Sequence, residues 1–132
     1  MSTREQAKDM IHVWKSEEAR RFAVSFVKHA LESGLPMFTT DLVPDEDRGF
    51  SAAIPGTVAS SLEAAHVIES VIVGSDLTGF CQMTAKTKRK AGKGRKLGVW
   101  KLYGNGSNAR VWLNRNGVHL DRQVQTVMDG VA

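Results

Sequence analysis

The residues best suited to chemistry form one basic run. In eleven residues it holds seven cations and no acidic residue that could neutralise them: Lys86, Lys88, Arg89, Lys90, Lys93, Arg95 and Lys96. Holding like charges this close together costs self-repulsion, which the phosphates of a polyanion would relieve. Gly92 and Gly94 would let the backbone reverse or lie close to a groove. The run therefore predicts a binding site for nucleic acid.

Two other interpretations of this run stay open. A solvated hairpin tip, or a disordered loop, would keep the protein soluble without binding a ligand. A short basic run can also serve as a targeting signal.

The charge of the whole chain is distributed unevenly. Of its 132 residues, positions 1–76 hold seven basic and twelve acidic residues, whereas positions 77–120 hold ten basic residues and no acidic one. A net charge of +4 hides this asymmetry. Such a basic half is the electrostatic footprint of a protein that meets a polyanion.

The elements that must position the run can be inferred from apolar spacing and turn residues. A helix over 16–33 is indicated by an N-cap at Ser16, apolar residues from Phe22 to Leu31 and a stop at Gly34. The spacing also predicts a second, brief helix over 41–47 and a third that opens at Pro55 and closes at Ser70.

The remaining pattern predicts mainly strands. Strands over 79–86 and 96–103 would flank the basic run, and Met37 to Thr39 would add a short one. We also expect a short helix over 3–14, a strand over 109–113 and a weak helix over 118–128.

This order resembles the small winged-helix proteins of bacteria and their phages. The residues that carry the resemblance are Pro55-Gly56-Thr57, Val71-Ile72-Val73, Lys86 to Lys96 and Val99-Trp100-Lys101-Leu102. It implies an α+β fold with a three-helix core and a β-hairpin wing over 16–103. Short extensions would cover 1–15 and 104–132. It also implies that the tip of the wing runs along phosphates or into the minor groove.

The third helix is a poor candidate for reading bases. No Lys or Arg lies between Arg48 and Lys86, and base-reading helices usually offer Arg, Asn or Gln. The helix could offer only single hydrogen bonds, from Thr57, Ser60 and Ser61, while Glu63 would repel phosphates. Its start at Pro55 could hold a phosphate with free N–H groups. We therefore expect the wing to supply most of the affinity, with little sequence preference.

We expect neither catalysis nor a cofactor. The four histidines are scattered without metal-ligand spacing, so no metal site is expected either. His66 is interpreted as a partly buried packing residue of the third helix. Trp100 is interpreted as a core residue, although Trp100 and Tyr103 could instead stack on unpaired bases.

The location follows from what the sequence lacks. Cys81 is the only cysteine, which fits a reducing compartment. The N-terminus has no secretory signal, and no apolar run is long enough to cross a membrane. We expect a cytoplasmic protein without membrane contact.

The leading hypothesis is a protein that binds duplex DNA through its wing. It would be a small transcription regulator or an accessory factor in replication or mobile-element biology. One alternative is a protein-interaction platform, in which residues 1–14 and 109–128 could mediate homodimerisation. Another is an RNA-binding protein.

Overall fold

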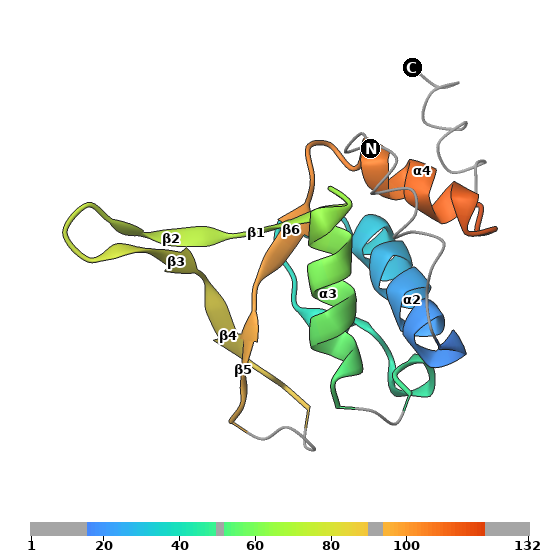
Figure 1. The fold of residues 1–132 in the computed structure, drawn as a ribbon, viewed down its shortest axis with the longest axis horizontal. Helices are drawn as coiled ribbons and strands as arrows, with labels where there is room; N and C mark the ends of the chain where they lie inside the picture. The colour runs from blue at the N-terminus through green and yellow to red at the C-terminus, as the bar shows by residue number, and fades with distance from the viewer. Residues whose placement is uncertain (1–15, 50–51, 90–93, 121–132) are drawn as a thin grey trace.

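The computed structural model describes residues 16–49, 52–89 and 94–120, which form an α+β fold (Figure 1). Its helices are α2 (Glu17–Ser33), α3 (Ile54–Ala64) and α4 (Ser107–Arg115). Its strands are β1 (Ile68–Ser70), β2 (Ile72–Ser75), β3 (Gly79–Gln82), β4 (Thr84–Lys86), β5 (Lys96–Gly98) and β6 (Trp100–Leu102). The helix predicted over 3–14, and most of the one predicted over 118–128, lie outside the described residues.

Helix α2 confirms the prediction for residues 16–33. The Ser16 hydroxyl caps it by accepting a 3.1 Å hydrogen bond from the backbone N–H of Ala19. Gly34 ends it in the left-handed conformation, with φ of 66°. One face of α2 is fully buried and forms the centre of the core, through Phe22, Ala23, Phe26, Val27 and Ala30.

The segment between α2 and α3 differs from the prediction of one helix over 41–47. It forms two 3-10 turns, η1 (Thr40–Leu42) and η2 (Asp45–Asp47). The residue before a proline is kept out of the α-helical region, and Val43, which precedes Pro44, has φ of −78° and ψ of 121°. The predicted strand at Phe38 is a single bridge to Trp100, with two backbone hydrogen bonds of 2.9 and 2.8 Å.

Helix α3 begins with Pro55 in its first turn, as predicted, but it ends at Ala64 and not at Ser70. His66 follows with a positive φ of 60°, and the chain then enters β1. Pairing of the β-branched Ile68 with Leu102 of β6 overrides continuation of the helix. His66 is exposed and its ring lies 5.1 Å from that of Tyr103, so its interpretation as a packing residue of the helix was wrong.

The strands form three separate antiparallel pairs that meet at one point: β1 with β6, β2 with β3, and β4 with β5. At that point three backbone hydrogen bonds close a ring. The N–H of Val71 donates to the carbonyl of Val99 at 3.0 Å, and the N–H of Val99 donates to Met83 at 2.9 Å. The N–H of Met83 donates back to Val71 at 2.7 Å. Each strand therefore exchanges one partner for another at this junction.

The three pairs leave the junction in different directions (Figure 1). The β1–β6 pair lies against α3, and the β4–β5 pair descends beside the N-terminal half of that helix. The β2–β3 pair projects away from the helices as a long arm. The predicted strands over 79–86 and 96–103 are thus confirmed in position, each divided between two partners.

Residues 109–113 are helical, which corrects the strand predicted there. Ala109, Trp112 and Leu113 lie at helical spacing on one face of α4 and are almost completely buried against α2. Residues 104–120 therefore share one core with the preceding elements. Trp100 is 8% exposed, so its prediction as a core residue is confirmed. Among the described helices, none has the length and apolar character to cross a bilayer.

We predict that Trp112→Ala lowers the free energy of unfolding by about 3–5 kcal/mol, because it removes one of the largest fully buried side chains. Urea denaturation followed by circular dichroism measures the effect. Val111→Ala is the matched control, since Val111 lies on the same helix and is 50% exposed. Equal effects of the two substitutions would contradict the packing of α4 into the core.

Candidate nucleic-acid interface

The β4–β5 pair places two cations opposite each other. We call residues 84–98 the basic hairpin. Its register pairs Lys86 with Lys96, and directly opposed residues of an antiparallel pair project from the same face. Both side chains are exposed. Like charges in this position destabilise a hairpin, so this part of the fold has a cost that a bound anion would offset.

The start of the hairpin loop is tied to η1 by one carboxylate. Asp41 accepts hydrogen bonds from the Thr87 hydroxyl at 2.8 and 3.0 Å and from the backbone N–H of Lys88 at 2.8 Å. The Thr87 hydroxyl oxygen in turn accepts from the backbone N–H of Arg89 at 3.1 Å. Hydrogen bonds to a charged acceptor are stronger than neutral ones, so Asp41 fixes the direction in which the loop leaves β4.

Asp45 corrects the interpretation that nothing neutralises the basic run. Its carboxylate lies 3.1 Å from an Nη of Arg89. For the other four described cations of the run, Lys86, Lys88, Arg95 and Lys96, the structure records no ion pair with any described residue. Lys90 and Lys93 lie outside the described residues. Most of the described charge on the hairpin is therefore available to a ligand.

Arg48 is a buried cation behind the hairpin. Its Nη1 donates to the carbonyl oxygens of Thr40 and Val43 at 2.8 and 3.1 Å, and its guanidinium lies 5.3 Å from the centre of the Phe22 ring. Burial lowers the pKa of Arg48, and the neighbouring Arg89 lowers it further, whereas the carboxylates of Asp41 and Asp45 raise it. Arg48 thus supports the 3-10 turns that hold Asp41 in place.

A groove of about 630 Å³ separates the basic hairpin from α3. The hairpin contributes basic residues to it, namely Arg89, Arg95 and Lys96. Helix α3 and the turn before it contribute mainly small residues, namely Ala52, Gly56, Ala59 and Ser60. The helix backbone is therefore accessible to a ligand that lies against the hairpin.

Of the three hydroxyl residues predicted on α3, only Ser60 lines this groove. Thr57 is exposed outside it, and Ser61 is half-buried. Glu63 lines the far end of the groove, where its carboxylate accepts a 2.6 Å hydrogen bond from the Ser70 hydroxyl. Arg48 and the carboxylate of Asp41 line the groove as well. The groove therefore has more basic than acidic side chains, and Glu63 makes it acidic towards the end of α3.

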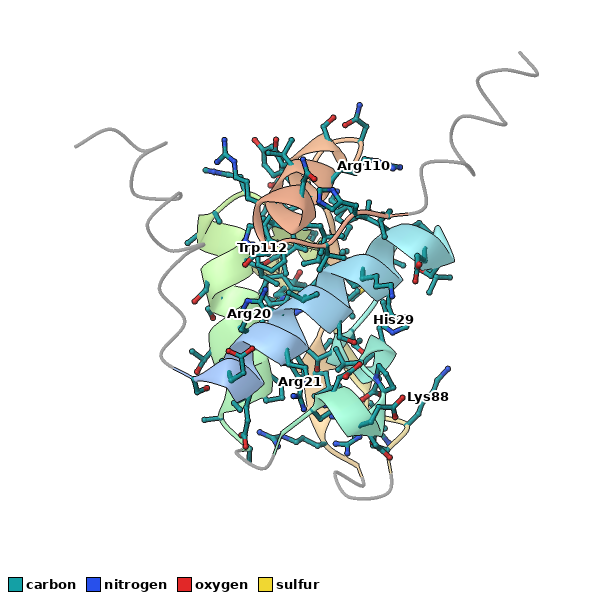
Figure 2. All side chains as sticks on the ribbon, turned by 90° about the vertical axis from the view of Figure 1, so that its right-hand side faces the viewer. Arg20, Arg21, His29, Lys88, Arg110 and Trp112 are labelled. Carbon is teal, nitrogen blue, oxygen red and sulfur yellow. The ribbon has the colours of Figure 1, made fainter. Side chains whose placement is uncertain are left out.

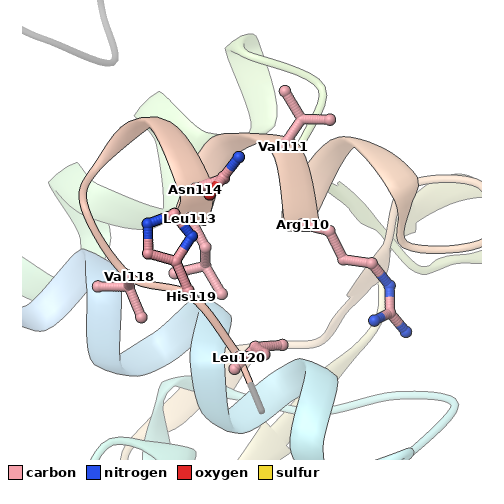
Figure 3. A pocket seen from close by; sticks show the side chains of 7 residues that line it. All are labelled: Arg110, Val111, Leu113, Asn114, Val118, His119 and Leu120. Carbon is pink, nitrogen blue, oxygen red and sulfur yellow. The ribbon is translucent and has the colours of Figure 1, made fainter. Parts of the chain in front are cut away.

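A further cation and a second hollow lie away from this groove. Arg110, on α4, is at the opposite end of the molecule from Lys88 (Figure 2). A smaller hollow of about 180 Å³ lies beside α4 and is lined by Arg110 and His119 (Figure 3). It contains none of the predicted binding residues. In the described ranges no cluster of histidine, cysteine or acidic side chains could hold a metal ion.

Comparisons of the chain with protein-family models, curated proteins and solved structures found no match.

Sequence reasoning missed Asp41 and Arg48 as parts of this interface. Asp41 lay in the segment predicted as a brief helix over 41–47, and its partners Thr87 and Lys88 lie more than forty positions away in the chain. A lone Arg48 beside Gly49 gives no periodic signal of burial. The available hint was the acidic segment around Asp45, which has a charge opposite to that of the run.

We predict that Asp41→Ala frees the hairpin loop and lowers the free energy of unfolding by about 1.5–3 kcal/mol, because hydrogen bonds to a charged group are lost. Amide hydrogen exchange, measured by NMR, should be faster at Lys88. Glu46→Ala is the control, since Glu46 is exposed in the same segment. Unchanged exchange at Lys88 would show that Asp41 does not hold the loop.

Proposed function

We propose that this protein binds duplex DNA through the basic hairpin, as a winged-helix protein acting as a regulator or an accessory factor. The single observation that carries the proposal is the placement of unpaired cations on a folded hairpin, with Lys86 directly opposite Lys96. A surface that repels itself in the free protein gains from phosphate contact. The element order is α2, the Phe38 bridge, two 3-10 turns, α3, β1, the β2–β3 pair, the β4–β5 pair, β6 and α4. This order is compatible with a winged-helix fold in which the two 3-10 turns stand where a second helix was predicted.

The groove supports a specific path for the phosphate backbone. Arg89, Arg95 and Lys96 line one wall, and the start of α3 with Gly56 lines the other. The first N–H groups of a helix have no partner within it, and they attract anions. Pro55 has no N–H, and the N–H of Thr57 already donates to the carbonyl of Ala53 at 3.1 Å, so Gly56 supplies the donor at this wall. A phosphate between these walls would meet guanidinium groups and the backbone N–H of Gly56 together. The carboxylate of Glu63 disfavours the far end of the groove for a phosphate.

The same geometry argues for low sequence preference. The groove face of α3 offers one hydroxyl, that of Ser60, and no Arg, Asn or Gln. Single hydroxyl contacts discriminate weakly between bases, whereas bidentate side chains discriminate strongly. We therefore infer that phosphate contacts supply most of the affinity.

We predict a steep salt dependence of binding to random duplex DNA. If about five hairpin cations contact phosphates, the slope of log K against log salt is about −4.5. The double variant Lys86→Ala/Lys96→Ala should make the slope about 1.8 less negative, because two phosphate contacts are lost. Fluorescence anisotropy over a salt series measures both. Stability of the free variant should be equal or higher, since an opposed like-charge pair is removed.

The matched control is Arg110→Ala/Arg115→Ala, which removes the same charge from exposed positions on α4. It should leave the slope nearly unchanged. Equal effects of the two double variants would mean that net charge, and not the hairpin, governs binding. A competition among duplex DNA, single-stranded DNA and RNA at two salt concentrations identifies the ligand class. Preference for either of the other ligands would overturn the assignment to duplex DNA.

A further inference from the structure

The β2–β3 arm presents apolar side chains to solvent. We define the arm as residues 72–82. Four large hydrophobic residues on it are exposed, namely Ile72 (56%), Val73 (41%), Leu77 (97%) and Phe80 (64%). The arm projects from the body at the junction, so none of the described helices covers either of its faces (Figure 1). A two-stranded hairpin in water is marginally stable by itself, and contiguous exposed apolar surface usually marks an interaction site.

The register of the arm gathers two of these residues on one face. Ile72 pairs with Gln82, and Gly74 pairs with Phe80, so Ile72 and Phe80 are diagonal neighbours on the same side. Gly74 has φ of 136°, and a Cβ there would lie 2.0 Å from the carbonyl oxygen of Gly79. The arm therefore requires glycine at this position, where the two backbones approach closely.

The charge of the arm argues against contact with nucleic acid. Asp76 is the only charged residue between positions 72 and 82, whereas the adjoining basic hairpin has several cations. Phosphate binding depends on Lys and Arg, which the arm lacks. One carboxylate is also too little to select a basic partner. The chemistry of the arm fits an apolar and nearly uncharged protein surface.

We propose that the arm is a dimerisation element that packs antiparallel against the arm of a second copy about a two-fold axis. The arm requires a partner surface that is apolar and nearly uncharged, and the arm of a second copy is such a surface. In an isologous dimer the same surface of each copy forms the contact, so the arm can serve as its own partner. Antiparallel packing places the two Asp76 carboxylates at opposite ends of the contact. It also joins the copies through the element that carries no cation, so their basic hairpins need not approach each other.

The exposed area is sufficient for a dimer of modest affinity. Val73 pairs with Cys81 and lies on the opposite face, so one contact covers Ile72 and Phe80 together with Leu77 at the turn. This removes on the order of 400 Å² from each copy, or about 800 Å² in total, which is the size of a weak, reversible interface. We therefore expect a dissociation constant on the order of 100 micromolar. The inference does not rest on the proposed function, because it concerns an element without cations.

Sedimentation equilibrium over a concentration series tests the proposal. The wild-type chain should dimerise, and Leu77→Ser/Phe80→Ser should raise the dissociation constant by about 100-fold, because most of the exposed apolar area of the arm is lost. The matched control is Leu35→Ser/Met37→Ser, which changes residues that are 47% and 43% exposed outside the arm. A monomeric wild-type chain, or a dimer that the arm variant leaves intact, would overturn the proposal.

A measurement on the unsubstituted chain covers the case in which the arm variant misfolds. Cys81 is exposed on the arm and is the only cysteine, so one spin label can be attached to each chain. Antiparallel arms place the two labels within about one arm length, roughly 15–20 Å, so dipolar coupling should be strong. Its absence at concentrations where dimers form would exclude the arm as the interface. The salt slope for DNA is a separate readout, so failure of either proposal is recognised independently.

Discussion

The ring of three backbone hydrogen bonds among Val71, Met83 and Val99 is the constraint on which the rest of the structure depends. Where a strand leaves one partner, its N–H and carbonyl groups lose theirs, and a half-buried backbone cannot leave them unsatisfied. The ring solves this for three strands at once, since each residue donates to one neighbour and accepts from the other. Three strand pairs can then diverge from one point: β1–β6 lies against α3, β4–β5 runs beside the first half of α3, and β2–β3 projects away from the helices.

Charged residues in the acidic half of the chain act as scaffolding for the basic half. Asp41 holds the hairpin loop through Thr87 and Lys88, and the buried Arg48 holds the turn that carries Asp41. The two opposite charge densities of the sequence are thus adjacent in space. Asp45 neutralises Arg89 in the hairpin loop, while Lys86, Lys88, Arg95 and Lys96 stay free of ion pairs with the described residues. The acidic segment positions the basic one without cancelling it.

The sequence predicted those features whose causes lie within one short segment, and it missed those that depend on contacts between distant segments. Helix α2 has a cap, a periodic apolar face and a glycine stop between Ser16 and Gly34, and all three are visible in the sequence. The exchange of strand partners at Met83 depends on two strands elsewhere in the chain. The residue types along the sequence therefore predicted where the strands lie but not which strands pair. The apolar pattern of residues 109–113 is compatible with a strand or with a helix. Burial of Trp112 against α2 favours the helix. The basic hairpin was visible because charge density is local, whereas the Asp41 tether was not.

The junction also separates two kinds of surface that would interfere if they shared one sheet. A continuous three-stranded sheet would place the apolar arm beside Lys86 and Lys96, and dimerisation there would bring two sets of cations together. Divergence at Met83 puts the cations on one pair and the exposed Phe80 on another. On the proposals made here, two copies joined through their arms would carry two basic hairpins held by rigid backbone hydrogen bonds. Their spacing would then be set by the junction, and a two-fold arrangement of phosphate contacts follows from the geometry of a single chain.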